Sequence, residues 1–102
     1  MHITNSNEIE QNAIDIFNSG YNCAQSVLLS FQPYFNLDGV TAGNIAAGFG
    51  AGMGSLQGTC GAVTGAYMVF GLASGSKYSD NSEKVESAYQ QVQKFEKEFA
   101  QK

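Results

Sequence analysis

Two cysteines are the residues best suited to chemistry in this sequence, and each follows a residue type that commonly caps a helix. Asn22 precedes Cys23, and Thr59 precedes Cys60. Because Asn and Thr are favoured N-cap residues, each cysteine is expected at the first position of a helix, where unpaired backbone N–H groups and the helix dipole favour an anion. A thiolate is such an anion, so the pattern predicts two nucleophilic, oxidisable or metal-binding sulfur atoms.

The expected compartment bears on what these thiols do. Residues 1–10 are polar and acidic, without the basic start or apolar run of a targeting signal, so we expect a cytoplasmic protein. In a reducing compartment, two cysteines are more often free thiols, redox centres or metal ligands than a structural disulfide. The alternative is that both are small core residues, since free cysteine packs well in apolar surroundings.

Other residue types support fewer kinds of site. His2 is the only histidine and lies in the N-terminal tail, so we expect it to take no part in catalysis. The glycine-rich run 48–54 has neither the dinucleotide-binding spacing nor the Lys of a P-loop, which favours a turn over a nucleotide site. Two thiolates without a nearby histidine supply at most half of a tetrahedral zinc or iron–sulfur site, so a metal would need a second subunit.

Charge and hydropathy exclude two classes of partner. The chain has 5 Lys and no Arg against 9 acidic residues, a net charge of −4, so it lacks the positive field that nucleic acid or anionic lipid requires. The apolar run 59–73 is shorter than the roughly 20 residues of a membrane span. We therefore expect no nucleic-acid partner and no membrane span, and we interpret this run as a buried core helix.

Helical periodicity without strand-like alternation predicts an all-α, single compact domain over residues 1–102, with four to five helices around a buried, glycine-rich central helix. Gly61 and Gly65 lie four residues apart on that central helix, so one of its faces allows another backbone to approach closely. The last helix carries a stripe of apolar residues that should pack along the bundle. The predicted helices cover residues 5–19 or 6–19, 22–33, 41–47, 59–74, and a last stretch that starts at 80 or 82 and runs to the C-terminus. The helix 59–74 is the central one, and we expect it to be buried on all sides. A loop is expected after Ala47.

Two motifs resemble those of one family. The segments are Gly20-Tyr21-Asn22-Cys23-Ala24-Gln25-Ser26-Val27 and Gly58-Thr59-Cys60-Gly61-Ala62-Val63-Thr64-Gly65, of which the second contains Cys-Gly-Ala-x-x-Gly. They resemble the C_GCAxxG_C_C family of putative redox-active proteins over nearly the whole chain. The resemblance implies a small bacterial or archaeal protein with a redox role and four characteristic cysteines. The C-terminal cysteine segment expected of the family is absent from this sequence.

We expect Cys23 and Cys60 to be the reacting residues of a thiol-disulfide site, which would make the protein a thiol oxidoreductase acting with an unidentified redox partner or a small-molecule disulfide. Asn22, Thr59, Gly61, Ala62 and Gly65 are expected to support that site, and no cofactor is needed. One alternative is a homodimer in which the same cysteines bind zinc or an iron–sulfur cluster. Another is a purely structural helical bundle.

Overall fold

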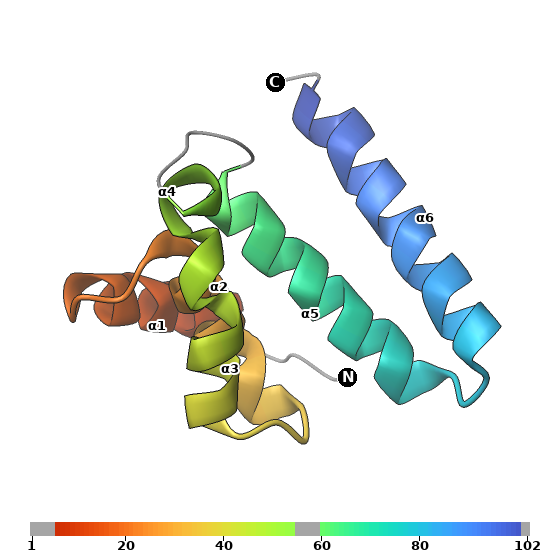
Figure 1. The fold of residues 1–102 in the computed structure, drawn as a ribbon, viewed down its shortest axis with the longest axis horizontal. Helices are drawn as coiled ribbons and strands as arrows, with labels where there is room; N and C mark the ends of the chain where they lie inside the picture. The colour runs from red at the N-terminus through yellow and green to blue at the C-terminus, as the bar shows by residue number, and fades with distance from the viewer. Residues whose placement is uncertain (1–5, 55–59, 101–102) are drawn as a thin grey trace.

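Helices account for almost all of the structure, a computed structural model that describes residues 6–54 and 60–100 (Figure 1). No strand occurs in these two segments, which confirms the predicted all-α class. Five of the helices have eight or more residues within the described ranges, in agreement with the predicted number. They are α1 (Ser6–Asn18), α2 (Cys23–Phe31), α3 (Gly39–Ala46), α5 (Gly61–Lys77) and α6 (Asn81–Ala100), joined by the one-turn α4 (Gly50–Met53) and two 3-10 turns, η1 (Gln32–Tyr34) and η2 (Ala47–Phe49).

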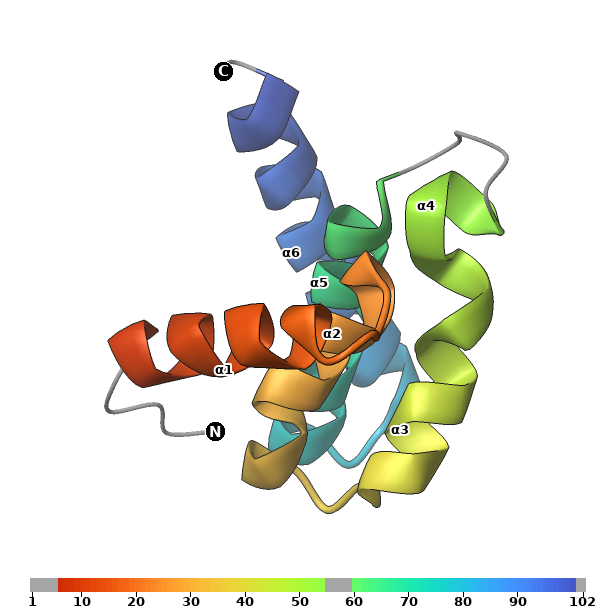
Figure 2. The same cartoon turned by 90° about the vertical axis from the view of Figure 1, so that its left-hand side faces the viewer.

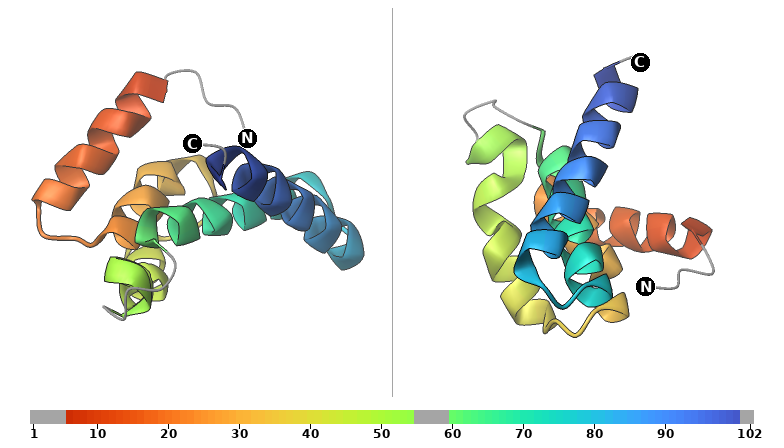
Figure 3. Two further views of the ribbon diagram at one scale, coloured as in Figure 1. Left: turned by 90° about the horizontal axis from the view of Figure 1, so that it is seen from above. Right: turned by 90° about the vertical axis from the view of Figure 1, so that its right-hand side faces the viewer.

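Helix α5 lies at the centre of the fold, as predicted. It packs against α2 on one side and against α6 on the other, and α1 and α3 in turn pack against α2 (Figures 1 and 3). The radius of gyration is 13.5 Å, close to the value of about 13 Å expected for a compact domain of this length. None of the helices in the described ranges is long and apolar enough to cross a membrane.

Helices α2 and α5 lie very close together in the core. Buried Ala24 and Leu28 of α2 meet Val69 of α5. A Cβ atom added to Gly65 would lie 2.9 Å from Cβ of Val27 and 3.0 Å from the carbonyl oxygen of Ala24, too near for a methyl group. The predicted close approach at this glycine is therefore confirmed.

Two helix boundaries in the middle of the chain differ from the prediction. Helix α3 begins at Gly39 rather than Thr41, because the Asp38 side chain caps it by accepting the Thr41 N–H at 2.9 Å. The loop predicted after Ala47 is wrong over residues 48–53, where the chain continues η2 and forms α4, which ends at Gly54 with φ of +65°. The remainder of that predicted loop, 55–58, lies outside the described residues.

Both ends of the central helix also differ. Helix α5 begins at Gly61 rather than Thr59 and ends at Lys77 rather than Ser74. The expectation that it is buried on all sides is wrong, since Gly71 and Gly75 are exposed.

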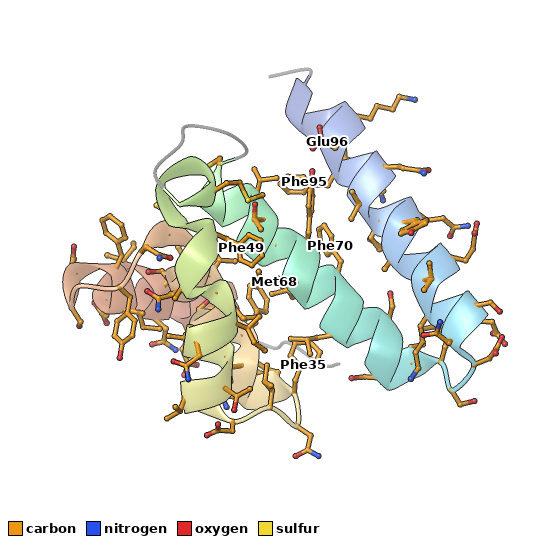
Figure 4. The ribbon with its side chains drawn as sticks, viewed as in Figure 1. Phe35, Phe49, Met68, Phe70, Phe95 and Glu96 are labelled. Atoms are coloured by element: carbon orange, nitrogen blue, oxygen red, sulfur yellow. The ribbon has the colours of Figure 1, made fainter. Side chains whose placement is uncertain are left out.

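The predicted apolar stripe of α6 is only partly covered, because α6 packs mainly on α5. Phe95 packs edge-on against the rings of Tyr67 and Phe70, at centroid distances of 5.9 and 5.8 Å (Figure 4). By contrast, Val85 and Tyr89 of the same stripe are 37% and 61% exposed. The stripe therefore holds α6 in place through its C-terminal half.

Candidate thiol site

Cys23 is the first residue of α2, as predicted, and Asn22 is its N-cap. The Asn22 side chain accepts the backbone N–H of Gln25 at 2.9 Å, and the Gln25 side chain accepts the backbone N–H of Asn22 at 3.0 Å. This reciprocal pair is a capping box, which satisfies two of the donors that a helix start leaves unpaired. The Cys23 side chain is half-buried, consistent with its predicted place on the same stripe as Val27.

The same two polar side chains tie the start of α2 to α3 and η2. Asn22 Nδ2 donates to the carbonyl of Ala47 at 2.9 Å, and Gln25 Nε2 donates to the carbonyl of Gly43 at 3.0 Å. A Cβ atom on Gly50 would lie 2.3 Å from Cγ of Asn22, so only glycine fits there unless Asn22 moves. The start of α2, which carries Cys23, is thus held by hydrogen bonds to residues more than 15 positions away.

Our sequence reasoning did not single out Gln25 or Gly50. Gln25 could have been found, because a Gln three residues after an Asn cap is the capping-box spacing. Gly50 could not, since its need to lack a side chain comes from a contact with Asn22 that no local pattern reveals.

Cys60 is the N-cap residue of α5 rather than its first helical residue, so the predicted arrangement is wrong by one position. Its ψ of 133° is extended, and helical geometry therefore starts at Gly61. The Cys60 carbonyl accepts the Thr64 N–H at 3.0 Å, while its side chain makes no capping hydrogen bond. The Cys60 side chain is exposed. Thr59, the predicted cap, lies outside the described residues.

Gly61 brings the starts of α2 and α5 together (Figure 2). A Cβ atom on Gly61 would lie 3.2 Å from Cβ of Cys23, 3.2 Å from the backbone nitrogen of Ala24 and 3.1 Å from the carbonyl oxygen of Phe49. Since Cys60 is the next residue in the chain, standard bond lengths place the two cysteine Cα atoms within about 10 Å of each other. The two predicted thiols are therefore neighbours, and both are free.

The predicted support residues lie where α2 and α5 meet. Gly61 and Gly65 provide the space in which α2 lies against α5, and Ala62 is a half-buried small residue between them. Because α2 begins at Cys23 and α5 begins at Gly61, both cysteines lie at the N-terminal ends of their helices.

A metal site is not formed by the part of the chain that the structure describes. No group of three or more His, Cys, Asp or Glu side chains there is arranged to hold a metal ion. His2 lies outside the described residues. Within the described residues, the site consists of two thiols with backbone N–H groups beside them.

The sequence was compared with known proteins. A family model described as "Putative redox-active protein (C_GCAxxG_C_C)" matches residues 21–102. The matched region includes both cysteines and the glycines that bring them together. Searches of curated proteins and of solved structures returned no match.

Proposed function

This chain belongs to the C_GCAxxG_C_C family, and on that premise we propose that Cys23 and Cys60 form a redox-active dithiol that reduces disulfide bonds. One observation carries the proposal. The Cβ position of Gly61, the residue after Cys60, is 3.2 Å from Cβ of Cys23, so two thiols 37 positions apart in sequence share one end of the α2–α5 pair.

The difference in exposure assigns the two roles. Cys60 is exposed and Cys23 is half-buried. An incoming disulfide can therefore reach Cys60 first, which makes Cys60 the attacking thiolate and Cys23 the resolving one.

The reaction takes place in two exchanges. The Cys60 thiolate attacks one sulfur of the substrate, the substrate S–S bond breaks, a mixed disulfide forms on Cys60, and the first substrate thiolate leaves. The Cys23 thiolate then attacks Sγ of Cys60, the mixed disulfide breaks, and the second substrate thiolate leaves. The protein dithiol is oxidised to an internal disulfide by two electrons, and the substrate is reduced to two thiols. An external dithiol returns the protein to its starting state by the same exchanges in reverse.

Closing the internal disulfide requires Cα atoms less than about 7 Å apart. Cys60 is well placed for that approach, since it precedes the first helical residue and its side chain makes no capping bond. A change in the backbone angles of Cys60 can then move its sulfur toward Cys23 without unwinding α5.

The proposal is tested with dithiobis-nitrobenzoate, an aromatic disulfide that releases a coloured thiolate. The wild-type chain should release two coloured thiolates and retain no label. Cys23→Ser should release one and retain one as a stable mixed disulfide on Cys60. Cys60→Ser is the matched control, in which the remaining half-buried Cys23 should react at least about tenfold more slowly than Cys60 does in Cys23→Ser.

Two results would overturn this function. A wild-type chain that retains two labels has no resolving step, because each thiol then reacts alone. A stoichiometric metal in dimeric protein purified without oxygen would replace the proposal by the shared metal or iron–sulfur site.

A further inference from the structure

Helix α5 contains two pairs of glycines, and within each pair the two glycines are four residues apart. The two pairs differ in their surroundings. Gly61 and Gly65 are buried against α2, which needs their lack of side chains. Gly71 and Gly75 are exposed, and apart from the neighbouring backbone of α5 no described atom lies within 4 Å of a Cβ atom built on either. A glycine inside a helix costs about 1 kcal/mol relative to Ala. No contact in the described chain offsets that cost at Gly71 and Gly75.

Both glycines border an apolar cavity of about 490 Å³ on one side of α5. Met68 of α5 and Phe35, which follows η1, lie on this side of the helix (Figure 4). The volume lies within the range of roughly 300–1,000 Å³ typical of small-molecule sites. The apolar side chains that line it are Leu28, Phe35, Leu37, Ile45, Met68 and Leu72.

The lining determines what kind of molecule fits. None of the described residues that border the cavity is charged, so a charged ligand would lose its hydration without gaining an ionic partner. Its only polar side chains are Asn36 and Ser76, and Ser76 Oγ already donates to the carbonyl of Leu72 at 2.9 Å. The exposed Asn36 amide, which has no hydrogen-bond partner within the described residues, is therefore left for a polar group of the ligand.

We propose that this cavity binds a neutral, largely apolar small molecule with one hydrogen-bonding group. The apolar part of the ligand lies against the backbone of α5 at Gly71 and Gly75, and its polar group lies at Asn36. A side chain at either glycine would extend into the space that the ligand fills.

The proposed site is separate from the thiols. Gly71 is ten residues after Gly61 on the same helix, a distance of about 15 Å along the axis. The ligand is thus out of reach of Cys23 and Cys60, and the inference holds whether or not the dithiol function is correct.

N-phenylnaphthylamine is a suitable probe, since it is neutral, apolar, carries one N–H donor and fluoresces more strongly in apolar surroundings. The full chain is titrated with this probe, and decanol is then added as a competitor with one hydroxyl group. The variant Gly71→Leu places a side chain in the cavity, and its Cβ atom has room, since nothing outside the neighbouring backbone of α5 lies within 4 Å of that position. The variant should fold because leucine favours a helix over glycine. Gln93→Leu adds the same side chain to an exposed position of α6 outside the cavity and serves as the control.

The wild-type chain is expected to bind one probe per chain, with displacement by decanol. Gly71→Leu should weaken binding at least about tenfold, whereas Gln93→Leu and the double variant Cys23→Ser/Cys60→Ser should bind as the wild type does. The proposal is overturned if the wild type shows no saturable binding or if Gly71→Leu binds equally well. It is also overturned if sedimentation shows a wild-type dimer that Gly71→Leu converts to monomer, because a second copy of the chain then covers the cavity.

Discussion

The substitution of glycine by alanine at two positions of α5 should change stability in opposite directions. At Gly65 the added methyl group would lie 2.9 Å from Cβ of Val27 and 3.0 Å from the carbonyl oxygen of Ala24. Because one of these neighbours is backbone, relief requires α2 and α5 to move apart. At Gly71 the same methyl group meets no described atom within 4 Å apart from the neighbouring backbone of α5.

The magnitude follows from two opposing effects. Ala in place of Gly in a helix contributes about 0.5–1 kcal/mol, largely by restricting the unfolded chain. Overpacking of a close interface costs about 1–3 kcal/mol. Taking the middle of each range, Gly65→Ala should lower the free energy of unfolding by about 1 kcal/mol, and Gly71→Ala should raise it by about 0.5–1 kcal/mol. In a domain of this size, a difference of about 2 kcal/mol in the free energy of unfolding between the two variants corresponds to a difference of roughly 10 °C in Tm.

Urea denaturation followed by far-ultraviolet circular dichroism measures both variants against the wild type. Equal m-values show that the comparison concerns stability alone. The close packing of α2 on α5 is refuted if Gly65→Ala is as stable as the wild type or more stable. Gly71→Ala controls for the intrinsic helix preference of alanine on the same helix.

Three other perturbations test the elements around the site. Asn22→Ala removes the cap of α2 and the hydrogen bond to Ala47. Chemical denaturation should therefore show a free energy of unfolding lower by about 1–2 kcal/mol. An unchanged denaturation midpoint would contradict the capping box. Phe95→Ala removes ring contacts with Tyr67 and Phe70 and should cost about 2–3 kcal/mol, with faster amide exchange in α6 than in α2; uniform exchange would show that α6 is held elsewhere. Burial, together with the hydrogen bond to Glu96 and its charge, raises the pKa of Tyr67 to about 12. The pKa of Tyr67 in the folded protein is thus above its value of 10.0 in the unfolded chain. The stability that the protonated Tyr67 confers is therefore present below pH 10 and lost as the pH rises from 10 to 12. Tyr67→Phe should abolish an absorbance step near pH 12, and a step that persists would refute the assignment.

Local signals were enough to predict most of the helices. Helix α1 (Ser6–Asn18) lies within the predicted range of 5 or 6 to 19, and the start of α2 follows from Asn22. The close approach at Gly65 was also predictable, because four-residue glycine spacing removes side chains from one helix face.

Long-range contacts account for what the sequence did not reveal. The glycine-rich segment forms η2 and α4 where Gly50 lies against Asn22, a contact between residues far apart in the chain. Local pattern also cannot decide whether a residue caps a helix or begins it, as at Cys60, since that depends on one backbone angle. The partial exposure of Tyr89 reflects the packing of α6 mainly on α5, which an apolar stripe alone does not specify.

The central claim is that Cys23 and Cys60 react with each other, and mass spectrometry of the chain equilibrated in graded mixtures of reduced and oxidised dithiothreitol tests it most directly. We predict a monomer that loses two hydrogen atoms in one reversible transition, with a single linked peptide pair containing Cys23 and Cys60. A chain that stays fully reduced across the series, or that forms disulfides only between chains, would contradict the account.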